Sequence, residues 1–235
     1  MIEVREIGMT VLFREPLFYI DFIYSVSFLL MAGLIVKGIT RATSMTLVSS
    51  FSMLAGFGFT HSITEMVDWV KLIRDELGQP ESAALLYTSQ FFLILSFVLL
   101  LQFAIDILTY KNSQSKRPRV IPSILVVIYL IVLFLFRISD IRQAGLIARH
   151  SFGFVGSTLS AVMFFRLNKT MKPLGNKKLN RGLIIAAVSM AVYAICGGLI
   201  VTPLFGLPIQ LCRAFCAFAL AFSAASILEI FKIRH

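Results

Sequence analysis

The sequence is poor in the residues from which soluble enzymes build their surfaces and active sites. Only 14% of its residues are charged, and it contains three cysteines, three histidines and one tryptophan. A typical soluble domain is about 25% charged. The sequence also shows no phosphate-binding glycine loop, no nucleophile motif and no paired catalytic carboxylates. These absences argue against a soluble enzyme and predict that the chain itself has no enzymatic activity.

Long apolar stretches take the place of these features, since 58% of the residues are hydrophobic. A helix needs about 20 apolar residues to cross a bilayer core of ~30 Å, and a tilted helix tolerates small departures. The sequence therefore predicts an all-α integral membrane bundle of seven transmembrane helices, occupying residues 17–235. The seven stretches are Phe18–Val36, Thr46–Val70, Ser89–Leu108, Ile121–Phe136, Phe152–Phe165, Leu183–Val201 and Leu211–Phe231.

Seven spans place the connecting loops alternately on the two sides of the membrane, and lysine and arginine are more numerous on one of these sides. Basic loops stay on the cytoplasmic side, so we expect the N-terminus outside and the C-terminus inside. Most acidic residues fall on the expected outer side; Asp106 and Glu229 do not. The net charge of +10 therefore indicates topology and attraction to anionic lipid, and not nucleic-acid binding. The basic residues expected inside are Lys37, Arg41, Lys111, Lys116, Arg117, Arg119, Arg166, Lys169, Lys172, Lys177, Lys178, Arg181, Lys232 and Arg234.

Residues 1–16 form a separate outer segment that does not resemble a cleavable signal peptide. Three glutamates precede the first apolar run, and no small-residue cleavage site follows it. The mixture of apolar and charged positions between Ile2 and Phe13 permits a short interfacial helix. A plain flexible tail remains the alternative.

The second apolar stretch carries the densest set of ionisable residues. His61, Glu65 and Asp68 lie within about 60° of one another around the helix axis, on one face. Trp69 suits the outer interface of a membrane, which places His61 about 12 Å deeper than Trp69. Ionisable groups at such depth usually face a cavity, a partner or a pathway.

Three other stretches open from the outside with polar groups at the same depth. The sequence therefore predicts a polar ligand-binding pocket in the outer half of the bundle, with Glu65 or Asp21 paired to Arg149 or Arg213. The candidate pocket residues are His61, Glu65, Arg149, Arg213, Gln210, His150 and Asp21.

Ordinary interfacial charges that extend toward water and hold helices together are the alternative interpretation. It is the favoured one for Asp68, Arg137 and Arg142. His61 and Arg213 favour the pocket, as does Glu65, because they lie a turn or more inside apolar sequence. Asp21 and His150 fit either interpretation.

A bound cofactor and transport were also considered. No cofactor or metal is favoured, although His61 with Glu65 or His150 could ligate a metal or haem. A small carrier would need polar residues in both halves of the membrane, and the expected inner half offers little beyond Gln102 and Asp106. Cys196, Cys212 and Cys216 lie in or near the last two stretches, where buried cysteine is usually a packing residue.

Three segments together resemble the multi-span N-terminal sensor region of bacterial sensor histidine kinases and diguanylate cyclases. Gly56–Trp69 resembles an "FGLLHGxxEW" motif, and Ala148–Ser157 resembles "ARYxLGFPGALL". Gly206–Ala217, followed by Ile227–Phe231, resembles "GxPVQxFRAxxA…LEIFE". The order is the same, but His150 stands where the family has tyrosine, Ser62 replaces glycine and Met66 replaces tryptophan.

The resemblance implies a signal-input domain of the bacterial inner membrane. It carries His61, Glu65, Arg149, Gln210 and Arg213 over as pocket residues for a small or lipophilic ligand. The last helix would relay a movement to a cytoplasmic kinase or cyclase output, which usually works as a dimer. No such output follows His235, so the resemblance implies either an excised domain or a subunit that signals through a partner.

Overall fold

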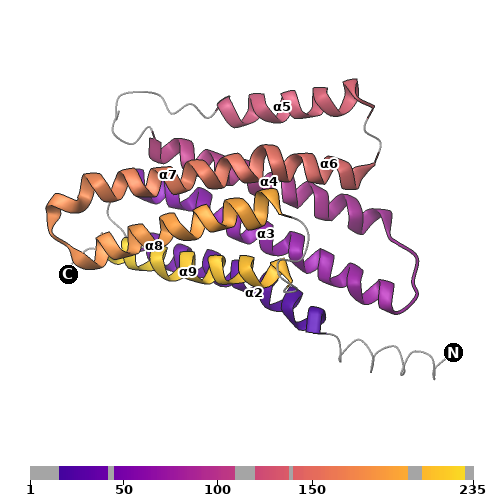
Figure 1. The fold of residues 1–235 in the computed structure, drawn as a ribbon, viewed down its shortest axis with the longest axis horizontal. Coiled ribbons are helices and arrows are strands. Elements are labelled where there is room, and N and C mark those ends of the chain that lie inside the picture. The colour runs from indigo at the N-terminus through magenta and orange to yellow at the C-terminus, as the bar shows by residue number, and fades with distance from the viewer. Residues whose placement is uncertain (1–15, 42–44, 109–119, 138–139, 201–207, 231–235) are drawn as a thin grey trace.

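The computed structural model describes residues 16–41, 45–108, 120–137, 140–200 and 208–230, and these form helices and short turns without a strand (Figure 1). The described part of each of the seven predicted apolar stretches is helical, apart from the end residues Phe136 and Ile200, which confirms the all-helical class. Of the expected outer segment 1–16, only Pro16 is described, as the first residue of a helix. The elements are α2 (Pro16–Ile39), α3 (Met45–Glu76), α4 (Ala83–Leu108), α5 (Val120–Leu135), α6 (Ile141–Ala148), η1 (Arg149–Gly153), α7 (Phe154–Met171), η2 (Lys172–Leu174), α8 (Lys177–Tyr193), η3 (Ala194–Leu199) and α9 (Ile209–Ile230).

Four helical segments are long and apolar enough to cross a membrane. They are α2, α4, the continuous segment Lys177–Leu199 and α9. The apolar part of α5, Ser123–Leu135, is shorter. The remaining long helices, α3 and the one that runs from α6 through α7, carry many of the charged side chains described below.

Six of the long helices form a closed ring, in the order α2, α3, α4, α7, α8 and α9, with α9 packed back against α2. α5 lies outside this ring (Figure 1), where it packs on α4. The Tyr129 hydroxyl on α5 donates to the Ala144 carbonyl on α6 at 2.8 Å. The outer side of α5 is apolar and open, as the 82% exposure of Phe134 shows. A helix exposed in this way fits contact with lipid better than contact with water.

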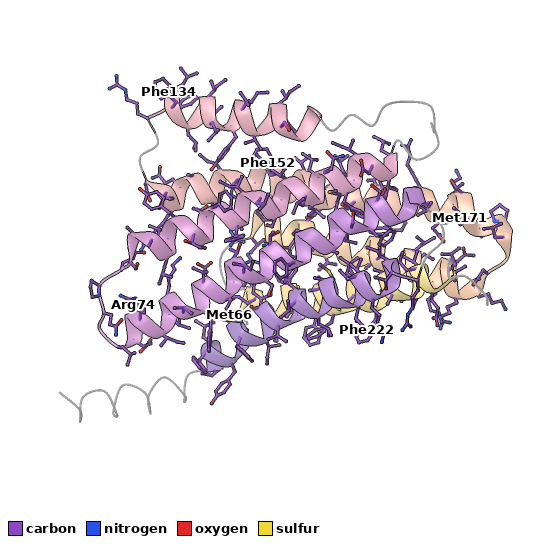
Figure 2. The ribbon with its side chains drawn as sticks, turned by 180° about the vertical axis from the view of Figure 1, so that it is seen from behind. Met66, Arg74, Phe134, Phe152, Met171 and Phe222 are labelled. Atoms are coloured by element: carbon purple, nitrogen blue, oxygen red, sulfur yellow. The ribbon has the colours of Figure 1, made fainter. Side chains whose placement is uncertain are left out.

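The two ends of the bundle are named here after residues labelled in Figure 2, the Arg74 end and the Met171 end. The Arg74 end holds the junction between α3 and α4. At this end the Trp69 indole donates to the Phe18 carbonyl at 3.1 Å, which ties α3 to the first turn of α2.

Three helices begin at least six residues before their predicted apolar stretches. One is α4, which begins at Ala83 instead of Ser89, and the other two begin with an N-cap. The fifth stretch was expected from Phe152, yet its helix begins at Ile141, where the Asp140 carboxylate accepts from the Arg142 N–H at 2.9 Å. The sixth was expected from Leu183, yet α8 begins at Lys177 with Asn176 as its N-cap. An N-cap satisfies N–H groups that have no partner within the helix, so a capped helix can extend beyond its apolar part.

Two π-helical turns, η1 and η3, interrupt the long helices and pack against each other. The contact between η3 and α7 depends on Gly198, because a Cβ there would lie 2.6 Å from the Phe154 Cα. Gly153 in η1 likewise admits the Phe97 ring of α4, which a Cβ would meet at 2.9 Å. Both glycines therefore allow a close approach of neighbouring helices.

Candidate functional site

His61 on α3 lies at the centre of the ring and is fully buried. Its Nε2 atom lies 3.1 Å from the Tyr24 hydroxyl of α2 and 2.9 Å from the Tyr193 hydroxyl of α8. Its Nδ1 atom lies 3.1 Å from the Ser96 hydroxyl of α4. One imidazole therefore links four helices that are distant in sequence.

The hydrogen-bond network assigns the tautomer of His61. The Ser96 hydroxyl donates its proton to the Leu93 carbonyl at 2.7 Å, so it must accept a proton from Nδ1–H of His61. A neutral imidazole that donates from Nδ1 has a single lone pair on Nε2. That lone pair accepts from a tyrosine hydroxyl, and two tyrosines stand in position to supply it.

Aromatic rings enclose this network and separate it from water. The rings of Phe28, Phe57 and Phe97 lie with their centroids 4.5, 5.3 and 5.6 Å from that of His61. Hydrogen bonds in such a low-dielectric setting are stronger, and an unpaired polar atom there is correspondingly unfavourable.

Glu65 and Arg149 form an incomplete ion pair one turn nearer the Arg74 end. Glu65 Oε1 lies 3.4 Å from His61 Nε2 and 3.9 Å from Arg149 Nη2. Neither Glu65 Oε1 nor Arg149 Nη1 has a hydrogen-bond partner among the described residues, although both atoms are buried. A direct hydrogen bond between charged groups is about 2.7–2.9 Å long. The separation therefore leaves this carboxylate and this guanidinium with unused hydrogen-bonding capacity.

Tyr24, His61, Glu65, Ser96, Arg149 and Tyr193 are together called the His61 cluster below. Arg213 and His150 lie beside it and bind the backbone of η3. Arg213 donates from Nε to the Cys196 carbonyl at 2.7 Å and from Nη2 to the Ile200 carbonyl at 3.0 Å. His150 Nδ1 lies 2.7 Å from the Gly198 carbonyl and donates to it.

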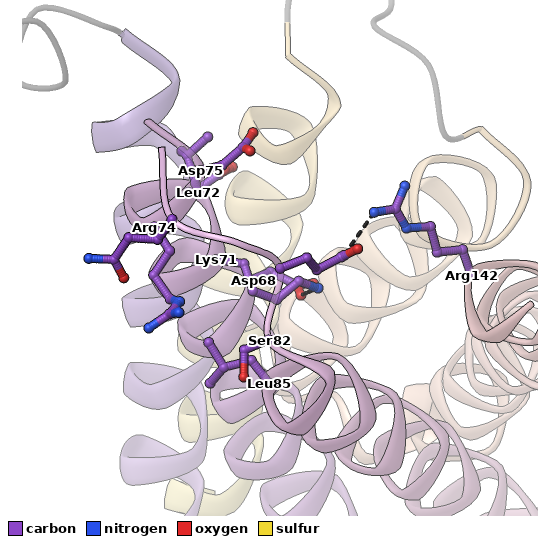
Figure 3. Close-up of a pocket in the computed structure, with 11 residues that line it drawn as sticks. Asp68, Lys71, Leu72, Arg74, Asp75, Ser82, Leu85 and Arg142 are labelled. Atoms are coloured by element: carbon purple, nitrogen blue, oxygen red, sulfur yellow. Dashed lines mark hydrogen bonds and ion pairs between the residues drawn. The ribbon is translucent and has the colours of Figure 1, made fainter. Parts of the chain in front are cut away.

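A charged cavity of about 410 Å³ lies at the Arg74 end (Figure 3). Asp21 and Asp68 border it, and Asp21 Oδ1 is buried without a hydrogen-bond partner in the described part of the chain. The Glu81–Arg142 ion pair closes one side at 2.8 Å. The hydrogen bond that Arg142 donates to the Glu81 carboxylate raises the pKa of Arg142 above its ordinary value. The full lining is Asp21, Asp68, Lys71, Leu72, Arg74, Asp75, Gln79, Glu81, Ser82, Leu85 and Arg142.

The predicted pocket residues occupy three places instead of one. His61, Glu65 and Arg149 meet in the His61 cluster, and of the four pairings considered the structure forms Glu65 with Arg149. Asp21 lies at the cavity. The remaining three are not members of either: Arg213 and His150 lie beside the cluster and bind η3, and Gln210 is half-buried in the first turn of α9. None of the described hydrogen bonds joins Gln210 to the cluster.

Asp68 and Arg142, expected as interfacial charges, make contacts of that kind. Asp68 Oδ1 accepts from the Ser89 hydroxyl at 2.8 Å and from Lys71 Nζ at 2.6 Å. Arg142 is 70% exposed in its pair with Glu81. Arg137 adopts a positive φ of 50° just after α5.

Three members of the His61 cluster were not among the sequence candidates. Tyr24, Ser96 and Tyr193 are uncharged, so a search for ionisable groups passes over them. The sequence feature that could have identified them is their position along the apolar stretches. Each lies on a different helix, at a membrane depth from which its side chain can reach His61. A polar side chain in the middle of an apolar stretch requires a partner, and that requirement applies to hydroxyl groups as well.

The donor set around His61 does not fit the alternative metal or haem site. The described residues contain no group of three His, Cys, Asp or Glu side chains that could hold a metal ion. Both nitrogens of His61 already have hydroxyl partners. Haem or metal ligation by His61 would require Nε2 to give up the two tyrosine contacts.

The fold and the site define a helical bundle with four segments long and apolar enough to cross a membrane, and with a buried polar cluster whose residues come from α2, α3, α4, η1 and α8. No protein-family model matches the chain, and comparisons with curated proteins and with solved structures found no similar protein.

Proposed function

We propose that the chain is the signal-input domain of a bacterial inner-membrane receptor, with seven membrane spans. A small molecule that both donates and accepts hydrogen bonds would enter from the outer side and bind between Glu65 and Arg149. Its binding would favour one packing of the bundle over another and move the end of α9. A cytoplasmic kinase or cyclase, working as a dimer, would read that movement.

The incomplete pair of Glu65 and Arg149 carries this proposal. Buried polar atoms in folded proteins are almost always satisfied, and each exception requires an explanation. Here a carboxylate oxygen and a guanidinium nitrogen face each other across too great a distance, inside an apolar ring. A molecule that accepts from Arg149 and donates to Glu65 would satisfy both groups at once.

The cavity at the Arg74 end supplies an entrance for such a molecule. Its lining mixes acidic and basic side chains, so it favours a small polar molecule over a purely apolar one. Asp21, whose Oδ1 has no hydrogen-bond partner among the described residues, lines this entrance. The orientation with the Arg74 end outside agrees with the positive residues, such as Arg166 and Lys172, that gather near the Met171 end.

A continuous series of contacts leads from the site to α9. Arg149 shares the turn η1 with His150, which holds the Gly198 carbonyl of η3. Arg213 of α9 holds the carbonyl of Cys196 in the same turn. At the Met171 end, Glu229 of α9 forms an ion pair with Lys178 of α8. A ligand shifts such an arrangement only if it binds its two packings with different affinity.

Native mass spectrometry of the purified chain in lipid nanodiscs tests this proposal. We expect a small molecule to remain bound to the wild-type chain and to be lost in Glu65→Gln, which preserves shape but removes the charge. Glu76→Gln is the matched control, because it neutralises an exposed carboxylate at the end of α3 that does not line the cavity. Equal retention, or equal absence, of bound molecules in all three chains would refute the receptor site.

An absorbance spectrum and elemental analysis of the same samples test the cofactor alternative. A haem band or a stoichiometric metal that disappears in His61→Ala would replace the receptor proposal with a cofactor protein. The carrier alternative predicts instead a substrate flux across vesicles that contain the chain.

A further inference from the structure

All three cysteines of the chain meet at one place, between η3 and α9. The Sγ atoms of Cys196 and Cys212 lie 3.1 Å apart, although sixteen residues separate them in sequence. Cys216 follows one helical turn after Cys212 on α9. All three are free thiols. A disulfide bond is about 2.04 Å long, so a closure of about 1 Å would join the nearest pair.

An apolar groove of about 450 Å³ reaches Cys212 and Cys216 from the outer face of the ring. Cys212 and Cys216 form part of its wall, together with exposed side chains such as Val192 and Phe215. No charged residue lines the groove among the described residues, and Ser189 supplies a hydroxyl. A groove of this composition, open where lipid would contact the bundle, fits an uncharged lipophilic molecule.

We propose that Cys196 and Cys212 form a dithiol that a lipid-soluble quinone oxidises from this groove. Cys212 Sγ would add to the quinone ring and form a carbon–sulfur bond. Cys196 Sγ would then attack Cys212 Sγ, forming the disulfide as the carbon–sulfur bond breaks. The two thiols lose two electrons and two protons, and the quinone leaves as hydroquinone with both protons on its oxygens. The reaction is the usual two-step exchange at sulfur, with the quinone carbon as leaving group.

The disulfide would join η3 to α9 directly beside Arg213. The Arg213 side chain already holds the Cys196 carbonyl, so oxidation would convert a hydrogen-bonded contact into a covalent one. If α9 relays the signal, which rests on the proposed function, the oxidised chain would be restricted to one packing. The redox chemistry itself needs only the thiol pair and the groove, so it stands or fails independently of the receptor proposal.

Counting of thiols in the full chain tests this inference. The reduced protein in nanodiscs is exposed to decylubiquinone under anaerobic conditions. It is then unfolded and alkylated, and its intact mass is measured by mass spectrometry. We expect three alkylated cysteines before the quinone and one after it, with one quinone reduced per chain. Cys216→Ala should still lose both of its thiols, whereas Cys212→Ala should keep both.

Val192→Trp tests the groove, because the added ring would occupy it. We expect quinone oxidation to become about tenfold slower or worse, since the reacting atoms must approach closely. Oxidation by diamide, a small azo oxidant that does not need the groove, should be unchanged, and far-UV circular dichroism confirms that the variant is folded. If the wild-type chain keeps three thiols with quinone, or Val192→Trp reacts at the wild-type rate, the quinone site is refuted. If Cys212→Ala loses its thiols as fast as the wild type, the assigned pair is wrong.

Discussion

At the scale of single residues, the two tyrosines around His61 supply more donors than one nitrogen can use. Nε2 has one lone pair, yet both Tyr24 and Tyr193 place a hydroxyl within 3.1 Å of it. The Tyr24 and Tyr193 hydroxyls also interact with each other, so the second hydroxyl has an acceptor other than Nε2. The arrangement therefore has two ways to satisfy His61, and loss of either hydroxyl leaves one.

We accordingly expect the two tyrosine-to-phenylalanine substitutions to be non-additive. Tyr24→Phe and Tyr193→Phe should each lower the free energy of unfolding by about 0.6 kcal/mol, the average for a hydrogen bond between membrane helices. The double variant should lose about 1 kcal/mol more than the sum, because Nε2 is then buried without a donor. Unfolding with SDS, followed by circular dichroism, measures all four chains. Simple additivity would contradict the tautomer assigned to His61.

At the scale of elements, the two π-helical turns bring basic side chains and the backbone carbonyls that accept from them to the same level of the bundle. Turns of this type are often found at functional sites. In η3 the carbonyls of Cys196 and Gly198 are directed to Arg213 and His150. Where η3 packs on the first residue of α7, Phe154, there is room for a glycine at position 198 but not for a side chain.

Gly198→Ala should therefore separate η3 from α7. Its Cβ would meet the Phe154 backbone, which cannot rotate away as the end of a side chain can. We expect a loss of about 1–3 kcal/mol in the free energy of unfolding, typical of overpacking, together with loss of the bound molecule. Gly33→Ala is the control, because nothing lies within 4 Å of its Cβ. It should change the free energy by less than about 1 kcal/mol. Similar losses in both variants would show that the contact is not specific.

At the scale of the whole molecule, the closed ring explains how a mostly apolar chain holds a buried charged group. Six helices surround the His61 cluster and shield it from lipid, while α5 packs outside against α4. Where lipid surrounds a protein, polar side chains must find partners within the bundle. The ring supplies these partners for His61 from α2, α4 and α8.

The proposed orientation is tested by reporter fusions along the chain. A fluorescent protein fused after His235 or after Lys177 should be fluorescent, since both positions are expected inside. Alkaline phosphatase should be active when fused after Gln79, between α3 and α4, and inactive after Lys177. The opposite pattern at these positions would show that the orientation is the reverse of the proposed one. Active phosphatase at both would show that fewer than seven helices cross the membrane.

The sequence alone determined the class of fold. Long apolar stretches in a membrane interior form helices, because a helix satisfies its backbone hydrogen bonds without water. It also identified His61, Glu65 and Arg149, since ionisable groups deep in apolar sequence are rare enough to be recognised individually. Helix starts such as Ile141 and Lys177 were missed, because hydrophobicity does not detect the caps that extend a helix.

Only the tertiary structure decided which polar groups meet. The order of helices around a ring depends on side-chain packing between segments that are remote in sequence, and depth along a single helix carries no information about rotation toward its neighbours. That packing brings Tyr193 to His61, directs Arg213 to η3 instead of Glu65, and places Cys196 beside Cys212. The sequence supplies the groups and their depth, whereas the ring supplies their partners.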